Sequence, residues 1–402
     1  MAAQFDLIVV GAGPAGAVCA TVAARKGLRV LVIDREKFPR DKVCGDCLNP
    51  AAWDVLQRLG MEQRVRELPH APLKKLEIAT INDRVFEFHL GERDRGEIGI
   101  RRRDLDLSLM QMAKAAGVAF LENSAVTSVK KSGEQWQIEA GGRSFTADKL
   151  VAADGRNSTV ARLLGMMPDQ KKDRVGLQTN LLVSPEQLNL VRMQLHPQGY
   201  SGGAHIGNNL WNLCLVARGD QIDALKSRAT ALWKLPSTLR WKSLTPLTRK
   251  ALPAVRDSLI LVGDAARVVE PFTGEGIYYA LASGELAGTH INEPAIYQKK
   301  HAELYRGRLW VNRLSRLAVM HPRLTSWALE NLPAEKILRQ LTTKVTGFSA
   351  ELQPNEPINT RAKARVIQPY QPSGPHGSRF SHVSHAPHEA VPSPPQNDVH
   401  RP

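Results

Sequence analysis

The chain has 402 residues, of which 43% are hydrophobic, with four cysteines and a formal net charge of +15. This length exceeds one ordinary core and favours two domains with an extension, whereas four scattered cysteines are too few for a disulfide framework and favour a reducing compartment. No apolar run reaches the roughly 18 residues of a membrane span, and no nucleic-acid-reading motif organises the basic residues, so we expect a cytoplasmic protein without a nucleic-acid partner.

The first predicted element is a short buried strand at 5–10, followed by a glycine loop and an alanine-rich helix at 15–25. In a strand–loop–helix unit that binds a dinucleotide, Gly11 makes the turn, Gly13 admits the pyrophosphate to the backbone and Gly16 permits close helix–strand packing. We therefore expect this loop to bind a cofactor pyrophosphate through Gly11, Gly13, Pro14, Ala15 and Gly16.

A second predicted strand covers residues 28–33 and ends at Asp34 and Arg35. A carboxylate at this position accepts hydrogen bonds from the adenosine ribose, so we expect Asp34, with Arg35 beside it, to bind the cofactor. Farther along the chain, Cys44 and Cys47 have C-x-x-C spacing. This spacing raises a redox alternative, because the motif can lower the pKa of one of its thiols.

Two later apolar runs each end in a turn that carries a carboxylate. Residues 150–153 precede Asp154-Gly155, and residues 259–262 precede Gly263-Asp264. A carboxylate on a tight glycine turn is suited to accept hydrogen bonds from the polyol of a long cofactor, and FAD has a ribityl chain whereas NAD has none. These turns therefore indicate FAD, with Gly263-Asp264 at the ribityl chain and Asp154-Gly155 in a second loop near the cofactor.

A further glycine loop, at 270–277, opens a predicted helix that runs to about His290. A helix N-terminus is electropositive and stabilises an anion in front of it, and reduced flavin carries negative charge near N1 and O2. We therefore expect four residues of this loop to contact the flavin: Pro271, Gly274, Gly276 and Ile277.

The predicted domains are interleaved along the chain. Residues 1–66, 100–170 and 251–292 are expected to form the FAD-binding domain. Residues 67–99 and 171–250 contain short alternating runs that predict an antiparallel substrate domain.

The C-terminal part divides into two regions. Residues 293–348 are helical and basic, with an approximate apolar stripe. Residues 295–345 are therefore either a helical surface that contacts anionic lipid at a membrane or a helical cap on the substrate domain. Residues 349–402 are rich in proline and histidine and predict a disordered tail, with no metal site.

Together the motifs at 11–16, 154–155, 263–264 and 271–276 resemble the flavoprotein superfamily of aromatic hydroxylases, geranylgeranyl reductases and flavin-dependent halogenases. Within it, residues 38–46 are similar to the P-R-x-K-x-C-G segment of the geranylgeranyl reductase branch. The resemblance implies an α/β fold in which a Rossmann-like FAD-binding domain of the glutathione-reductase type is interleaved with an antiparallel β-sheet substrate domain. It also implies that Cys44 and Gly45 line the flavin and substrate cavity and that Arg102 lies near the FAD pyrophosphate.

The resemblance implies an FAD-dependent oxidoreductase that reduces, or desaturates, a carbon–carbon bond of an apolar or isoprenoid-like small molecule. NAD(P)H or a reduced electron carrier would supply the electrons transiently, because the sequence has no second dinucleotide motif. One alternative is a monooxygenase that hydroxylates or epoxidises an aromatic or polyketide-like substrate, and another is a non-catalytic redox sensor acting through Cys44 and Cys47. The catalytic group stays open, with Cys44 as the first candidate and Tyr278, Tyr279 and His205 as further residues expected near the cavity wall.

Overall fold

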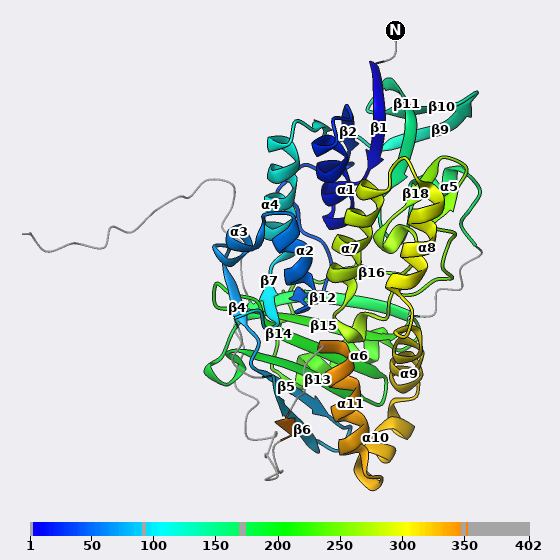
Figure 1. Ribbon diagram of the computed structural model, residues 1–402. Coiled ribbons are helices and arrows are strands. Elements are labelled where there is room, and N and C mark those ends of the chain that lie inside the picture. The colour runs from blue at the N-terminus through cyan, green and yellow to red at the C-terminus, as the bar shows by residue number, and fades with distance from the viewer. Residues whose placement is uncertain (1–2, 91–93, 169–173, 347–350, 353–402) are drawn as a thin grey trace, which may run out of the picture. The chain divides into compact units, whose positions relative to one another are not determined.

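The computed structural model describes residues 3–90, 94–168, 174–346 and 351–352, and these residues build two large sheets joined by a small one (Figure 1). The α/β fold that the sequence predicts, with a Rossmann-like sheet interleaved with an antiparallel sheet, is confirmed. Of the predicted tail at 349–402, only Glu351–Leu352 are described, and they form a short strand; the remaining residues of that prediction lie outside the described part of the chain.

The first sheet has the strand order β17-β18-β11-β1-β2-β8, and an antiparallel ribbon of β9 and β10 extends from β11. The pairs β11–β18, β1–β11, β1–β2 and β2–β8 are parallel. The strands span β1 (Ala3–Val10), β2 (Val30–Ile33), β8 (Ala119–Leu121), β9 (Val126–Ser132), β10 (Gln135–Ala140), β11 (Arg143–Ala152), β17 (Val255–Arg256) and β18 (Leu259–Leu261).

Both faces of the first sheet are buried, as the near-continuous apolar sequence of its strands requires. Leu7 and Val9 point to one face, where α1 (Pro14–Arg25), α4 (Arg102–Ala115), α7 (Gly276–Thr289) and α8 (Pro294–Leu304) contribute to one core. Ile8 and Val10 point to the other face and pack with the β9–β10 ribbon. This arrangement directs the carboxyl ends of β1, β2, β11 and β18 toward one edge, where ligands of open α/β sheets bind.

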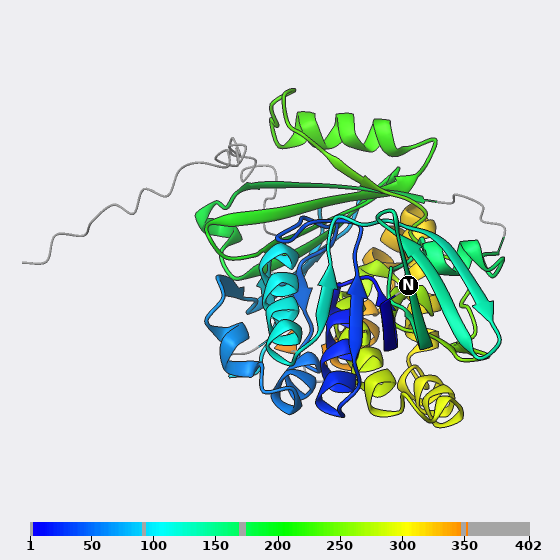
Figure 2. The same ribbon diagram turned by 90° about the horizontal axis from the view of Figure 1, so that it is seen from above.

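The second sheet is antiparallel except for the parallel pair β13–β5. Its order is β16-β12-β15-β14-β13-β5-β6-β19, with β5 (Lys75–Ala79), β6 (Val85–His89), β12 (Arg174–Leu182), β13 (Leu190–His196), β14 (Gly199–His205), β15 (Leu210–Arg218), β16 (Lys242–Leu244) and β19 (Glu351–Leu352). The helix α6 (Ile222–Leu232) covers one face and the first sheet lies on the other side (Figure 2).

Two features join the sheets. A three-stranded sheet of β3 (Cys47–Leu48), β7 (Ile98–Ile100) and β4 (His70–Pro72) lies between them. In addition, Arg174 of β12 makes a bidentate ion pair with Glu270, with nitrogen–oxygen distances of 2.9 and 2.8 Å, and both side chains are only 2% exposed. Two hydrogen bonds in parallel fix the orientation of the carboxylate and guanidinium planes, so this pair sets the position of the segment before α7 against the second sheet.

The remaining elements are short or lie toward the C-terminus. They are α2 (Ala52–Arg58), α3 (Glu62–Arg66), α5 (Thr159–Leu163), α9 (Leu309–Met320), α10 (Pro322–Asn331), α11 (Ala334–Thr346) and the 3₁₀ turns η1 (Pro185–Gln187), η2 (Gly263–Ala265) and η3 (Pro271–Thr273). None of the described helices has the length and apolar character needed to cross a bilayer.

The C-terminal region is helical, as predicted, but its apolar stripe does not lie on one helix. The chain leaves α8 at Leu304 and enters α9 at Leu309, with Gly307 at φ +76° between them. A positive φ is natural for glycine and interrupts the helical repeat. Residues on either side of the break therefore face different surroundings, since Tyr305 is buried and Trp310 is 50% exposed.

Candidate functional site

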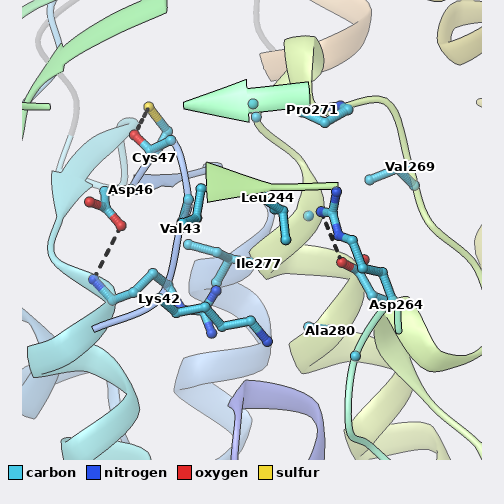
Figure 3. A pocket seen from close by; sticks show the side chains of 18 of the residues that line it. Lys42, Val43, Asp46, Cys47, Leu244, Asp264, Val269, Pro271, Ile277 and Ala280 are labelled. Carbon is cyan, nitrogen blue, oxygen red and sulfur yellow. Dashed lines mark hydrogen bonds and ion pairs between the residues drawn. The ribbon is translucent and has the colours of Figure 1, made fainter. Parts of the chain in front are cut away.

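A cavity of about 530 Å³ extends from the carboxyl edge of the first sheet to the inner face of the second sheet (Figure 3). Lys42, Ile277 and Asp264 lie around it, and Lys42 is distant in the sequence from the other two. Among the residues predicted to contact the cofactor, it is lined by Gly11, Gly13, Pro14, Ala15, Asp34, Arg35, Cys44, Gly45, Arg102, Asp154, Gly155, Asp264, Pro271, Gly274, Gly276 and Ile277. Gly16 and Gly263 do not line it.

The loop between β1 and α1 has no space for side chains at two of its glycines. Gly11 has φ +102°, and a Cβ built there would lie 2.5 Å from the carbonyl oxygen of Ala153. A Cβ on Gly16 would overlap the carbonyl oxygen of Gly11. The missing side chain of Gly16 therefore lets the helix approach the strand closely, although Gly16 itself does not line the cavity. Because α1 begins after Gly13 without a side-chain cap, its first backbone N–H groups are available to an anion.

Asp34 lies across this loop. Its Oδ2 accepts a hydrogen bond from the backbone N–H of Ala12 at 2.7 Å, and its Oδ1 accepts one from Glu36 at 2.9 Å. The carboxylate is buried beside the cavity, where a carboxylate has lone pairs left for hydroxyl donors. Arg35 lies at the rim instead, with a side chain that is 76% exposed and pairs with Glu36 at 3.3 Å.

Two arginines face the glycine loop, and only Arg102 was predicted from its sequence context. Arg102 binds Asp106 through two hydrogen bonds of 2.7 and 2.8 Å, and Arg40 approaches the same carboxylate at 3.1 Å. A Cβ on Gly13 would lie 3.6 Å from Arg40 Nη2 and 3.9 Å from Arg102 Nη2. Two positive charges therefore share one buried carboxylate beside the loop, which leaves positive charge for a diphosphate.

Lys42 adds a third cation to the cavity. Its Nζ lies 3.3 Å from the position that a Cβ would take on Gly155. The side chain is exposed to the open space of the cavity. Partial loss of hydration between the cavity walls lowers the pKa of Lys42 to about 8, with the charges of Arg102 and Arg40 acting in the same direction. An anion in the cavity would restore the charged form of Lys42, because an opposite charge favours ionisation.

Asp154 has one oxygen engaged and one without a partner. Its Oδ2 accepts hydrogen bonds from the backbone N–H groups of Thr159 at 2.6 Å and Val160 at 3.0 Å, which caps α5. Its Oδ1 is buried and has no hydrogen-bond partner among the residues that the structure describes, and burial raises the pKa of Asp154. A buried acceptor without a partner is costly, so this oxygen is suited to a hydroxyl donor of a bound molecule.

Gly263-Asp264 forms the turn η2 at the end of β18. Gly263 has φ +54° and its N–H donates to Ser283 Oγ at 2.9 Å, so its role is backbone geometry rather than cavity contact. Asp264 lines the cavity, and its Oδ2 accepts a hydrogen bond from Arg156 at 3.3 Å. Arg156 also lines the cavity and was not identified from the sequence.

The loop before α7 contributes a helix N-terminus. Gly274 adopts φ +70°, and α7 begins at Gly276 without a side-chain cap. The preceding Glu275 is buried and pairs with Arg308 at 2.8 Å. The uncapped N–H groups of α7 therefore lie beside the cavity and stabilise negative charge in it.

The segment 44–47 is tied to the second sheet. The N–H of Cys44 donates to Gln178 Oε1 at 3.2 Å, and Asn212 Nδ2 donates to the carbonyl oxygen of Cys44 at 2.8 Å and to Asp46 Oδ2 at 2.9 Å. Asp46 also accepts from the N–H of Arg102 at 3.3 Å, and burial raises its pKa to about 7. This loop is thus held by both halves of the molecule.

The cysteine pair does not have the electrostatics of a reactive dithiol. Cys44 and Cys47 are free thiols. Burial raises the pKa of both thiols, and the charge of Asp46 raises that of Cys44 while Glu97 raises that of Cys47. A raised pKa disfavours the thiolate, which is the nucleophile in disulfide exchange.

Three expected wall residues lie elsewhere. Tyr278, Tyr279 and His205 do not line the cavity, so their expected position at its wall is wrong. The ring of Tyr279 stacks on Tyr305 with a centroid distance of 4.5 Å, because the helical repeat turns it toward α8 rather than toward the cavity. His205 Nδ1 accepts a hydrogen bond from the N–H of Asn189 at 3.3 Å at the end of β14.

Glu97 lines the cavity and was not identified from the sequence. It directly precedes β7, and its Oε1 lies 3.7 Å from the position that a Cβ would take on Gly274. Burial raises the pKa of Glu97 to about 7, and the charge of Glu275 acts in the same direction. No sequence motif surrounds this residue, so only the fold brings it to the loop before α7.

The far end of the cavity is apolar. Its lining comes from the inner face of the second sheet and the residues that follow its strands, from η3, and from α9 and α11. These residues are Leu76, Ile78, Leu90, Val191, Met193, Tyr200, Val216, Leu244, Leu247, Phe272, Val311, Leu338, Leu341 and Val345.

The residues at the near end fit FAD. The glycine loop, α1 and the two arginines would hold the pyrophosphate, and Asp34 would accept from the adenosine ribose. The partnerless oxygen of Asp154 and the carboxylate of Asp264 offer acceptors for hydroxyl groups. Among the described residues, no group of three or more His, Cys, Asp or Glu side chains is arranged to hold a metal ion.

Comparison with known proteins gives the same cofactor. Residues 4–198 match the family model described as "FAD binding domain". The menaquinone reductase of Mycolicibacterium smegmatis is 28% identical over 318 residues, which cover 71% of this chain and 76% of that protein. The digeranylgeranylglycerophospholipid reductase 1 of Methanococcoides burtonii is 27% identical over 333 residues, which cover 76% of this chain and 80% of that protein.

Solved structures share the fold at low identity. PqsL of P. aeruginosa, in complex with 2-aminobenzoylacetate, superposes with a TM-score of 0.68 at 19% identity, covering 82% of this chain and all of that one. The flavin-dependent brominase Bmp2 superposes with a TM-score of 0.64 at 20% identity, covering 90% of this chain and 98% of that one. The chain is therefore an FAD-dependent oxidoreductase that matches an FAD-binding domain over residues 4–198 and is similar to reductases named for menaquinone and for a digeranylgeranylglycerophospholipid.

Proposed function

We propose that this enzyme reduces, or in reverse desaturates, a carbon–carbon double bond of an apolar, isoprenoid-like small molecule. The observation that carries the proposal is the continuity of the cavity: the residues that fit FAD and the apolar wall line the same space. Bound FAD supplies hydride chemistry, and the protein supplies orientation, dryness and proton donors.

The apolar end suits a substrate without charge. Its lining is aliphatic and aromatic, with side chains from the second sheet, from η3 and from α9 and α11. Small-molecule sites bury most of their ligand in such lining and use a few polar groups to fix its orientation. Two relatives support this substrate class, since they are named as reductases of menaquinone and of a digeranylgeranylglycerophospholipid.

Reduction of a double bond also needs a proton, and Glu97 is the group that we assign to deliver it. Its carboxyl lines the cavity near Gly274, beside the N-terminal segment of α7. A pKa raised to about 7 keeps much of the carboxyl protonated at neutral pH, which a general acid requires. Asp46 serves a different role, because Asn212 and the N–H of Arg102 already occupy its two oxygens.

Electrons would come from NAD(P)H or from a reduced carrier that binds transiently. The candidate cations for an anionic donor at the cavity are Arg156 and Lys42, which lie beside Asp264 and Gly155. Retention of activity with a chemical reductant would show that the donor is exchangeable.

A monooxygenase is the second candidate function. It is supported by the fold of PqsL, a structure of which is described as a probable FAD-dependent monooxygenase and superposes with a TM-score of 0.68 at 19% identity. That likeness concerns the fold, and a monooxygenase would use the same cofactor residues. The two functions differ in their need for oxygen.

An anaerobic single-turnover experiment tests the proposal. The FAD-loaded enzyme is reduced with dithionite under argon, freed of excess reductant and mixed with menaquinone or with a digeranylgeranylglycerophospholipid. We expect the flavin spectrum to return to the oxidised form and the isoprenoid chain of the product to gain two hydrogen atoms, located in the chain rather than in the quinone ring by fragmentation in the mass spectrometer. If reoxidation requires oxygen and the product gains an oxygen atom, the enzyme is a monooxygenase and the proposal is wrong.

A further inference from the structure

The helices α9, α10 and α11 expose an unusual number of large apolar side chains. Leu324 is 63% exposed, Leu317 59%, Trp327 55% and Ile337 55%, and Trp310, Leu314 and Leu332 are also exposed. The helix α10 packs against both α9 and α11, so these side chains belong to neighbouring helices (Figure 1). We call these seven residues the apolar helical face. Exposed apolar groups of this kind mark interaction sites.

The same helices form a wall of the cavity. On α9, Val311 and Ser315 line the cavity, whereas Leu314 and Leu317 are exposed. On α11, Leu338 lines the cavity and its neighbour Ile337 is exposed. A single layer of helix therefore separates the apolar end of the cavity from the apolar helical face.

Basic residues accompany this face. Residues 309–346 contain six Lys or Arg against two Glu, a net charge of +4. Arg313, Arg323, Lys336 and Arg339 are exposed on the three helices. Tryptophan, leucine and arginine that are exposed together on neighbouring helices are the composition of segments that lie in the interface of an anionic bilayer.

We propose that the apolar helical face docks on the surface of an anionic lipid bilayer and thereby places the apolar end of the cavity beside the membrane. The charge favours lipid over the two other possible occupants. In a dimer of two copies, residues 309–346 of each chain would bring a net charge of +4 against the same charge of the other, which is repulsive. Residues 353–402 carry five Lys or Arg against three acidic residues, so this segment is basic as well. The proposal deepens the proposed function, since an isoprenoid-like substrate is lipid-soluble, but its test does not depend on turnover.

Vesicle co-sedimentation of the full-length, FAD-loaded protein tests this docking. We expect binding to phosphatidylcholine–phosphatidylglycerol vesicles, weak binding to pure phosphatidylcholine vesicles, and loss of binding as salt rises, because the basic residues are screened. The double variant Leu317→Glu/Trp327→Glu removes two exposed apolar groups and adds two negative charges. We expect its partition onto the anionic vesicles to fall by roughly tenfold or more.

The matched control is Leu163→Glu, an exposed leucine of α5, a helix that lies in the upper half of Figure 1 while α10 lies at the bottom. It should bind vesicles as the wild type does, and all variants should retain FAD. The proposal is overturned if the wild type ignores anionic vesicles at low salt, or if the double variant binds them equally well. It is also overturned if sedimentation velocity shows a dimer that the double variant converts to a monomer while vesicle binding is unchanged.

Discussion

The two sheets reach the shared cavity in different ways. The first sheet presents turns at the carboxyl ends of adjacent strands, where Gly11, Asp34, Asp154 and Asp264 each follow a buried apolar strand. The second sheet presents the flat inner face of its strands, and its wall is completed by α9 and α11 from the other end of the chain. One half is built from local turns and the other from long-range contacts.

This difference indicates which side of the cavity determines specificity for the cofactor and which side determines specificity for the substrate. On the cofactor side the backbone itself is constrained, since a Cβ on Gly11 would lie 2.5 Å from the carbonyl oxygen of Ala153. On the substrate side an apolar residue such as Leu76 or Leu338 could be exchanged for another of similar volume at modest cost. We therefore expect the cofactor side to resist substitution and the substrate side to tune which molecule is accepted.

The largest effect is expected at Glu97, whose carboxyl lines the cavity beside the loop before α7. In Glu97→Gln the side chain keeps its size but loses its proton, so kcat should fall by roughly 10²- to 10⁴-fold while FAD affinity stays unchanged. In the wild type, kcat should decrease as pH rises through about 7, because the acid form is the active one. Steady-state kinetics across pH measure both effects.

The control for this variant is Glu134→Gln, an exposed residue in the turn between β9 and β10. It should leave kcat and the pH profile unchanged. A Glu97→Gln enzyme with wild-type kcat, or one that keeps the loss of activity near pH 7, would show that Glu97 is not the proton donor.

The second effect concerns the buried ion pair between Arg174 and Glu270, which connects the second sheet to the segment before α7. Glu270→Gln removes one charge of the pair with Arg174 and leaves the other buried, which should lower the free energy of unfolding by about 3–5 kcal/mol. Lys242→Met breaks an exposed ion pair with Asp41, which also joins the two halves, and should cost about 0–1 kcal/mol. Urea denaturation measures both, and equal costs would mean that the buried pair does not hold the two halves together.

The sequence predicted the cofactor side better than the substrate side, for a physical reason. Asp34, Asp154 and Asp264 stand directly after apolar runs, so strand ends and turn chemistry reveal them. Arg40 belonged to a recognised segment, but its contact with Asp106 depends on how the loop folds onto α4. Glu97 has no local signal at all, because its neighbours in the cavity come from another part of the chain.

The same reasoning explains the errors in the C-terminal half. The approximate apolar stripe predicted within 293–348 is divided between two helices, because Gly307 breaks the repeat between α8 and α9. Tyr278 and Tyr279 follow a glycine loop that does line the cavity, yet the helical repeat turns both away from it. Membership of a helix was predictable, whereas the face that each residue presents depends on where the helix begins.

A smaller effect is expected at Asp264. Asp264→Ala would leave hydroxyl groups of bound FAD without an acceptor, at a cost of about 1–3 kcal/mol, which corresponds to a loss of FAD affinity of about 5- to 150-fold. Asp223→Ala, at an exposed position of α6, is the matched control and should bind FAD normally. Titration of apoprotein with FAD by fluorescence measures the affinity, and an unchanged value in a folded Asp264→Ala protein would remove this residue from the cofactor site.

The smallest effect separates two neighbours. Arg35 has an exposed side chain at the cavity rim, whereas Asp34 is buried and fixed by Ala12. Arg35→Ala should change FAD affinity by less than about threefold, since exposed ion pairs contribute about 0–1 kcal/mol. The same titration tests it, and a loss as large as that of Asp34→Ala would show that Arg35 binds the cofactor directly.

This chain is expected to bind FAD at the carboxyl edge of its first sheet. The most direct test is the flavin content of the gently purified full-length protein, measured from its visible absorption spectrum and from chromatography of the released cofactor. The structure predicts about one FAD per chain, retained by the wild type and depleted in Asp264→Ala. A protein that shows no flavin absorption and does not take up added FAD would show that this edge of the sheet is not an FAD site.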